Sequence, residues 1–365
     1  MTLPARTQRG GPSRHRSRLP RLARAATSVA LTIVLVTVVI PKVTGSHWRT
    51  ILTAIGAVSG VQLLVLGAVW IAGLVAHSTT LAAAMPRLGR RRALMLSLTG
   101  SSVSNLFPFG GAIGMALNYR MSRSWGFEPR SIGTYTVITN IWDVLARLSL
   151  PAIALAWLVL AGAAGASRLI GTAALATAAL VVFAAATTLF LASETAAVQM
   201  ARILDRAVNG AAALAHRPVR FDVGGALVRM RAESADLVRS AWPRLTIGVA
   251  SYAALLAVLL WASLDVAGAK LTVPVVLAGL AFERVVTMVP LTPGGAGVVE
   301  VGLSGLLIAL GGDPVATVAG VLLYRFFTYA VEIPVGGLGA LTWLWTNRSR
   351  QLAPAGVTIH PPPPV

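Results

Sequence analysis

A helix break interrupts the apolar stretch 272–311, in the run Thr292-Pro293-Gly294-Gly295-Ala296-Gly297-Val298-Val299-Glu300. Proline fixes φ and lacks a backbone N–H, and three glycines within residues 293–297 oppose a continuous helix. Non-helical backbone cannot face lipid, because its N–H and C=O groups would have no partners, so protein or a water-filled cavity must surround it. The break, with the acidic Glu300 after it, is therefore a candidate binding site inside a membrane-spanning fold.

The composition is typical of a polytopic membrane protein. The chain is 56% hydrophobic and 12% charged, with a mean hydropathy of +0.75. It has no cysteine, which excludes disulfides and cysteine nucleophiles, and its five histidines are scattered, so we predict no metal and no cofactor. The formal charge of +19 comes largely from arginines between apolar segments, and since no nucleic-acid motif accompanies them we predict no nucleic-acid partner.

We predict an all-α polytopic membrane protein with about six full spans and two broken, re-entrant-type helical hairpins. The predicted spans are about Ala25–Ile40, which Pro41 ends, Ala57–Ala76, 132–163, Leu169–Ala192, Leu245–Leu264 and Val315–Trp345. The hairpins are 93–118 and 272–311, each interrupted by Pro and Gly. The charge pattern does not distinguish a re-entrant hairpin from one that crosses the membrane twice.

Lys and Arg residues set the predicted orientation, because cytoplasmic loops are enriched in them. If each hairpin enters and leaves on one side, both termini are cytoplasmic, and only Lys42, Arg49, Arg168 and Lys270 lie outside. We therefore predict a multi-pass protein of the inner or plasma membrane. Its predicted parts are a basic cytoplasmic tail (1–24), a transmembrane domain (25–346) with a cytoplasmic helical insertion (194–244) interrupted near Pro218 and Gly224-Gly225, and a disordered C-terminal tail (347–365).

The two halves of the chain share an order of features that indicates an inverted repeat. In each half a hairpin break is followed by a Gly-x-acid-Pro element, Gly126-Phe127-Glu128-Pro129 in the first and Gly311-Gly312-Asp313-Pro314 in the second, at an offset of 185 residues. A charged span then reaches Pro151 or Pro334, at an offset of 183. Under the predicted orientation the hairpins enter from opposite sides, which is the arrangement of many secondary transporters with a site at the repeat interface.

Seven charged residues fall within the apolar segments, and each costs roughly 2.5–3.5 kcal/mol at a helix centre. They are Asp143, Arg147, Glu283, Arg284, Glu300, Arg325 and Glu332. Asp143 and Arg147 are four residues apart and could pair on one helix face, as could Arg325 and Glu332, which are seven apart. Two interpretations stay open: internal ion pairs that fix the packing, or a substrate pathway.

The chemistry of these residues favours an anionic ligand. A guanidinium fork binds phosphate oxygens in a bidentate manner. Helix N-termini that begin after Gly111 and Gly297 would add N–H donors and positive dipole ends. The candidate substrate-binding residues are Asn105, Pro108, Gly110, Gly111, Asp143, Arg147, Glu283, Arg284, Pro293, Gly294, Gly295, Gly297, Glu300, Tyr324, Arg325 and Glu332.

The run from Thr292 to Glu300, then Gly311 and Leu322-Leu323-Tyr324-Arg325, resembles the transmembrane family of lysylphosphatidylglycerol synthases. In the first half Asn105, Pro108 and Asp143 fit that family, whereas Ile113 and Gly114 lie where members often carry an acidic residue, so no carboxylate role is carried over to the first hairpin. The resemblance covers roughly residues 20–345. Only a short tail follows Trp345, so the resemblance implies lipid translocation without lipid aminoacylation.

The leading hypothesis is a flippase-like translocase that moves a lipid with an anionic or phosphate-bearing head group, either a phospholipid or a polyprenyl-phosphate-linked lipid. Arg147 and Arg325 would contact phosphate, and Asp143, Glu300 and Glu332 would pair with arginine or contact a cationic group. The alternative is an intramembrane transferase with Asp143 or Glu300 as base, and a third hypothesis is a scaffold that docks through 194–244. Small-residue-rich spans such as Ala173–Ala186 are compatible with a homo-oligomer.

Overall fold

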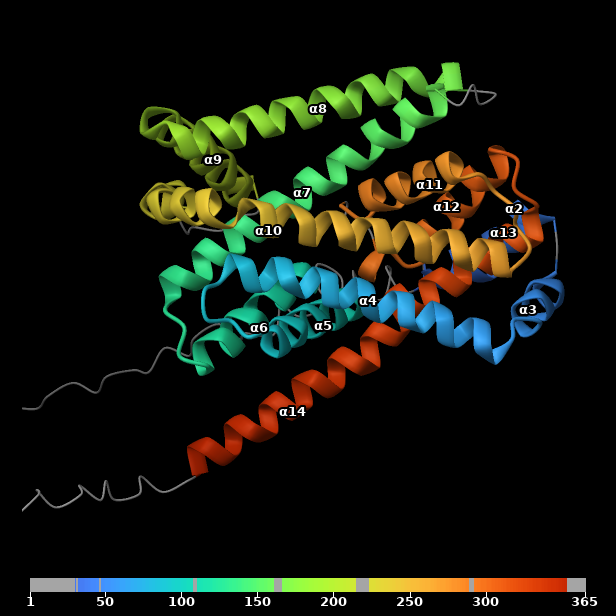
Figure 1. Cartoon of the computed structure of the whole chain (residues 1–365), viewed down its shortest axis with the longest axis horizontal. Helices are drawn as coiled ribbons and strands as arrows, with labels where there is room; N and C mark the ends of the chain where they lie inside the picture. The colour runs from blue at the N-terminus through green and yellow to red at the C-terminus, as the bar shows by residue number, and fades with distance from the viewer. Residues whose placement is uncertain are drawn as a thin grey trace, which may run out of the picture.

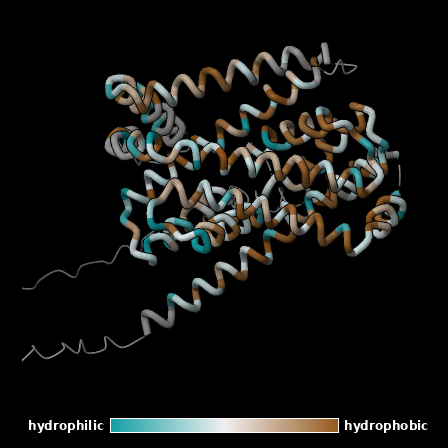
Figure 2. Tube along the Cα trace, viewed as in Figure 1, coloured by the Kyte–Doolittle hydropathy of each residue, from teal (hydrophilic) through white to brown (hydrophobic). Residues whose placement is uncertain are grey.

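The computed structural model describes residues 30, 32–45, 47–107, 110–160, 166–214, 223–288 and 292–352, and in these ranges all regular elements are helices. Four helical segments are long and apolar enough to cross a membrane: Gly60–Ala84, Pro129–Trp157, Ser234–Val266 and Pro314–Asn347. Figure 2 shows the apolar residues along the middle of these helices. The chain is thus an all-helical membrane protein, as predicted.

The helices lie mostly along the long axis of the molecule (Figure 1). The first half comprises η2 (Leu35–Val39), α2 (Ile40–Thr44), α3 (Trp48–Gly56), α4 (Gly60–Ala84), α5 (Arg90–Leu106), α6 (Gly110–Ser124), α7 (Pro129–Leu160) and α8 (Ala166–Ala192). The second comprises α9 (Glu194–Leu214), α10 (Val223–Val266), α11 (Val273–Val286), η3 (Pro293–Gly295), α12 (Val298–Ala309), α13 (Pro314–Arg325), η4 (Phe326–Val331) and α14 (Glu332–Leu352).

Each predicted break separates two helices that pack against each other as an antiparallel hairpin. In the first, α5 and α6 approach so closely that a Cβ on Gly114 would lie 2.8 Å from the Gly100 carbonyl oxygen. In the second, a Cβ on Gly279 of α11 would lie 2.8 Å from the Leu307 side chain of α12. Figure 1 shows the first hairpin toward the left end of the molecule and the second toward the right end.

The tips of the two hairpins meet. A Cβ on Gly294 in the second break would lie 2.6 Å from Asn105 Oδ1. Only a residue without a side chain allows this approach, and Gly294 also has a positive φ of 55°. From the neighbouring η4, the Tyr329 hydroxyl also donates a hydrogen bond to the carbonyl oxygen of Asn105, at the end of α5, over 3.1 Å. The contact joins segments that are far apart in the sequence.

The elements that follow the hairpins have the same local geometry in both halves. After α6, Phe127 N donates to Ser122 O and Gly126 N to Arg123 O; after α12, Gly312 N donates to Leu307 O and Gly311 N to Ile308 O. Both pairs have the hydrogen-bond spacing of the Schellman motif, with a positive-φ glycine, Gly126 or Gly311, at its centre. The next helix then begins at Pro129 or Pro314, so the sequence repeat corresponds to a repeated backbone conformation at these turns.

Several predicted boundaries were wrong. The first helical segment passes Pro41 and continues to Thr44, because Pro41 lies in the first turn of α2, where its missing N–H costs nothing. Helix α4 continues to Ala84 rather than ending at Ala76. Helix α10 includes Gly224, Gly225 and Pro243, so it joins the 194–244 stretch to the following apolar span without a break, while Pro218 lies outside the described residues.

Two buried apolar clusters hold the helices on either side of the hairpin tips. One includes Leu259, Leu260 and Leu264 of α10, with Leu303 and Leu307 of α12. The other joins the end of α4 to α5, α6, α10 and α14, through Met85, Leu96, Met121, Leu245 and Trp343. The polar residues between these clusters are therefore held in a rigid frame.

Helix α14 approaches α5 most closely at Gly336. A Cβ on Gly336 would overlap the Leu98 carbonyl oxygen, and Ser102 Oγ donates to Ile333 O over 2.8 Å at the same crossing. We expect Gly336→Leu to lower the free energy of unfolding by about 1–3 kcal/mol or more, because overpacking forces the helices apart. Thermal unfolding in detergent measures this. Gly337→Leu is the control, since a Cβ there meets nothing within 4 Å, and an equal loss in both variants would contradict the expectation.

Candidate functional site

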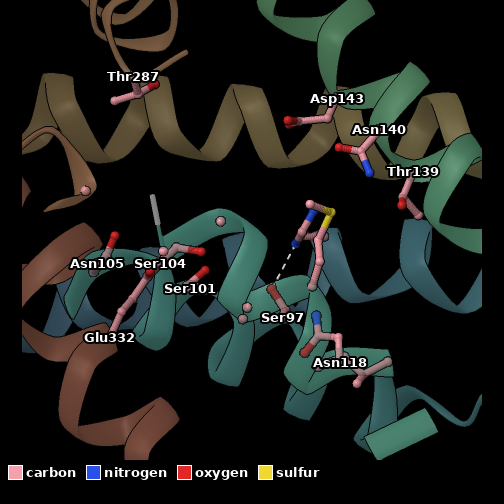
Figure 3. A pocket seen from close by; sticks show the side chains of 18 of the residues that line it. Ser97, Ser101, Ser104, Asn105, Asn118, Thr139, Asn140, Asp143, Thr287 and Glu332 are labelled. Atoms are coloured by element: carbon pink, nitrogen blue, oxygen red, sulfur yellow. Dashed lines mark hydrogen bonds between the residues drawn. The ribbon is translucent and has the colours of Figure 1, made fainter. Parts of the chain in front are cut away.

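A cavity of about 550 Å³ lies between the first hairpin, α7 and the tip of the second hairpin. Figure 3 shows Thr139, Asn140 and Asp143 of α7 on one side and Ser97, Ser101, Ser104 and Asn118 of the first hairpin on the other. The predicted site residues that line it are Asn105, Gly110, Gly111, Asp143, Arg147, Glu283, Arg284, Gly294, Gly295, Arg325 and Glu332. Most of the candidate residues are thus brought to one place.

Arg325 holds the second helix break together. Its Nε donates to Glu300 Oε1 over 2.8 Å, and its Nη2 donates to the Gly294 carbonyl oxygen over 2.9 Å. Glu300 in turn accepts from the backbone N–H of Gly297 over 2.5 Å, and Thr32 Oγ1 donates to Ala296 O over 3.2 Å. The side chains of Arg325 and Glu300 are 7% and 8% exposed. The non-helical backbone is therefore satisfied by protein groups, as its position between apolar segments demands.

A second buried group lies beside this one on α11 and α13. Arg284 donates to both carboxylate oxygens of Glu283, over 2.6 and 3.0 Å, and to the Tyr324 hydroxyl over 3.2 Å. Glu283 Oε1 also lies 3.8 Å from Arg325 Nη1. Because the Glu283 side chain is only 1% exposed, this carboxylate is compensated by two arginines and a hydroxyl rather than by solvent.

Asp143 and Arg147 form the accessible charged pair of the cavity. Arg147 Nε donates to Asp143 Oδ2 over 2.8 Å, as their spacing on one helix face predicts, and Arg147 Nη1 donates to Thr287 Oγ1 over 3.3 Å. The Asp143 side chain is 43% exposed and the Arg147 side chain 24%, against 17% for Arg284 and 7% for Arg325. Of the three cavity arginines, Arg147 is the one that a ligand reaches most readily.

Glu332 lies at the cavity wall without an ion pair. It is 7% exposed, and no Arg or Lys nitrogen of the described chain lies within 4 Å of its carboxylate. The predicted pairing with Arg325 does not form, because the π-helix η4 (Phe326–Val331) separates the two residues. A π-helix has more residues per turn than an α-helix, so a seven-residue spacing no longer returns to the same face.

The remaining candidates support the site without lining the cavity: Pro293, Gly297, Glu300 and Tyr324. Pro108 lies outside the described residues. At the N-terminus of α12, the N–H of the N-cap residue Gly297 is already taken by Glu300 Oε2, and Gly297 does not line the cavity. The N-terminus of α6 does line the cavity, through Gly110 and Gly111.

Sequence reasoning missed the neutral polar residues of the cavity. Ser97, Ser101 and Ser104 recur on α5, and Thr136 and Asn140 lead along α7 to Asp143, at spacings of three or four residues. His77, whose Nδ1 lies 2.9 Å from Ser97 Oγ, adds a further polar group. The helical periodicity of these uncharged residues is a signal that a search for charged residues does not detect.

The charges around the cavity nearly cancel. Three arginines (Arg147, Arg284 and Arg325) face four carboxylates (Asp143, Glu283, Glu300 and Glu332), of which Glu332 alone has no arginine within 4 Å in the described chain. A polar ligand can therefore replace the present partners of Arg147, and Glu332 can bind a positively charged group of the ligand. The other ion pairs stabilise the fold.

Comparison with known proteins agrees with the resemblance found in the sequence. No curated protein matches the chain. The family model described as the lysylphosphatidylglycerol synthase TM region matches residues 24–336, which include both hairpins, the cavity and all of the charged residues discussed above. With its apolar helices, the chain therefore belongs to the lysylphosphatidylglycerol synthase transmembrane-region family, as a membrane protein related to lipids.

Proposed function

We propose that this protein is a flippase-like translocase that moves a phospholipid or polyprenyl-phosphate-linked lipid between leaflets. The observation that carries the proposal is the charged and polar cavity bounded by α7 and by two broken hairpins whose tips meet. A polar cavity lowers the cost of moving a head group through hydrocarbon. The head group would occupy the cavity while the tails stay in the bilayer.

The hairpin arrangement supports an inverted repeat with both hairpins re-entrant. The first hairpin begins and ends near the arginine-rich connections, and the positive-inside rule makes that end cytoplasmic, together with both termini. The second hairpin begins and ends at the opposite end of the molecule (Figure 1). With the predicted span Leu169–Ala192, which lies within α8 (Ala166–Ala192), and the predicted N-terminal span, this gives six full crossings in the inner or plasma membrane. Two re-entrant hairpins that meet at a substrate site are a transporter arrangement.

In this proposal Arg147 binds the phosphate of the head group, because it is the least buried of the three cavity arginines. Its guanidinium can give up its hydrogen bonds to Asp143 and Thr287 and donate to phosphate oxygens instead. Arg147→Ala is expected to slow leaflet exchange of fluorescent phosphatidylglycerol in proteoliposomes at least tenfold. Arg147→Lys keeps the charge but not the fork, and we expect an intermediate rate.

The matched control for Arg147→Ala is Arg239→Ala, an exposed arginine on α10 that does not line the cavity. Wild-type exchange rates in both variants would show that Arg147 does not bind the head group. If the folded wild-type protein exchanges no anionic, zwitterionic or polyprenyl-phosphate lipid, the protein is not a translocase of these lipids. Mass spectrometry of the recovered lipids tests the transferase alternative, which requires a chemically altered product.

Glu332 would make the site prefer phospholipids whose head group carries an ammonium group. A buried carboxylate without an arginine partner is suited to the ammonium group of a zwitterionic or cationic head group. We expect Glu332→Gln to slow the exchange of phosphatidylethanolamine more than that of phosphatidylglycerol, by about fivefold in relative rate. Paired assays on one preparation measure the ratio, and an unchanged ratio would show that Glu332 does not contact the head group.

Arg325 and Glu300 have a different expected role, because they hold the break rather than meet the ligand. Either Arg325→Ala or Glu300→Ala is expected to lower the free energy of unfolding by about 3–5 kcal/mol, since each leaves a buried charge unpaired. The double variant should lose clearly less than the sum of the two single losses. Denaturant unfolding in detergent measures this cycle, and additive losses would contradict the role.

A further inference from the structure

Helices α6 and α7 both line the cavity but make little contact with each other, and we call the boundary between them the α6–α7 seam. Helix α6 packs on α5 through Gly110, Gly114 and Met121 and has little contact with α7. Several of the residues that line the cavity beside this seam are nevertheless exposed apolar side chains: Phe107 is 49% exposed, Met115 51% and Tyr119 43%. The cavity therefore continues to the outer surface of the helix bundle between α6 and α7.

The two walls of the seam differ in polarity. On α6, Gly111, Met115 and Tyr119 follow one another at intervals of four residues and form one stripe along the helix. On α7, the lining residues Thr136, Asn140, Asp143 and Arg147 form a polar stripe at spacings of three or four residues. Figure 3 shows Asn140 and Asp143 directed into the open space of the cavity.

An exposed cation lies near the end of α6. Arg120 follows Tyr119, is exposed, does not line the cavity, and makes no hydrogen bond or ion pair with the described part of the chain. It can attract an anionic head group to this end of α6, from which the polar stripe of α7 leads as far as Arg147. An amphiphile that lies in the seam thus has a polar track on one side and an apolar stripe on the other.

We propose that the α6–α7 seam is the lateral entrance of the site and binds a diacyl phospholipid, with the head group along the polar stripe of α7 and an acyl chain on the Gly111–Met115–Tyr119 stripe of α6. This inference rests on the proposed function and adds to it the route and the tail-binding surface. A phospholipid fits because its phosphate and acyl chain match the two walls, and because the seam opens on the surface that apolar helices present to the bilayer.

Filling the seam tests the route. A Cβ on Gly111 meets nothing within 4 Å, so a side chain can begin there without a clash. We expect leaflet exchange of phosphatidylglycerol to fall with side-chain size from Gly111→Ala to Gly111→Leu to Gly111→Trp, by at least tenfold for Trp. Met115→Trp is a second variant on the same stripe. The control is Gly337→Trp on α14, where a Cβ also meets nothing within 4 Å.

The outcomes separate the two proposals. If the wild type exchanges lipid and the folded Gly111→Trp and Met115→Trp variants exchange it equally fast, the seam is not the entrance, although the translocase stands. If the wild type exchanges no lipid, the proposed function fails first. Unfolding temperatures that match the wild type show that a slow variant is blocked rather than misfolded.

Photolabelling tests the tail-binding surface without relying on exchange. The probe is phosphatidylglycerol with a diazirine in one acyl chain, added to the full chain in detergent. We expect adducts on Met115 and Tyr119 that fall at least fivefold in Arg147→Ala, because the head group is no longer held. Labelling of Leu175, which is 72% exposed on α8, should not change. Equal changes at Met115 and Leu175, or no change at either, would overturn the inference.

Discussion

The ion pair between Arg325 and Glu300 is the interaction on which the rest of the structure depends. A helix break between apolar segments leaves backbone groups that need partners, and lipid supplies none. Arg325 donates to the free carbonyl oxygen of Gly294, and Glu300 accepts the free N–H of Gly297. These backbone contacts offset the cost of removing the two charges from water, as a buried ion pair requires, and the ion pair in turn fixes the backbone of the break. The ion pair and the helix break therefore stabilise each other.

The two halves of the chain have the same turn geometry at Gly126 and Gly311, but different side chains at the positions that follow. At the offset of 185 residues that relates Gly126 to Gly311, the position of Arg325 corresponds to Asn140, and that of Glu332 to Arg147. The second half thus has the buried ion pair that closes its hairpin tip, whereas the first half has neutral polar groups that leave its side of the cavity open. This difference explains why the cavity lies mainly against the first hairpin and α7, and why the accessible arginine is Arg147.

The sequence was sufficient to predict the helix breaks and most of the charged lining, since Pro, Gly and intramembrane charge each have a strong local physical meaning. It could not predict which charges pair across the chain. The seven-residue spacing of Arg325 and Glu332 indicated a shared face, and only the π-helix between them, which local sequence does not specify, removes that contact. The neutral stripe of Thr136 and Asn140 was missed because each residue is unremarkable alone and acquires meaning only beside the first hairpin. Helix ends at Pro41 and Gly224 were misplaced because both residues are tolerated in a first turn.

The near neutrality of the cavity limits how a translocase of this kind could work. A site of free arginines would bind phosphate tightly and release it slowly, which opposes turnover. Here each arginine already has a carboxylate partner. A phosphate that binds Arg147 replaces its present hydrogen bonds to Asp143 and Thr287, so the net gain in binding free energy is small. Thr287, at the end of α11, is one of the partners that a phosphate would replace, and that contact links α7 to the second hairpin. On the proposed function, the ligand would therefore be held weakly and would loosen the link between the two halves as it binds, which is what movement between leaflets requires.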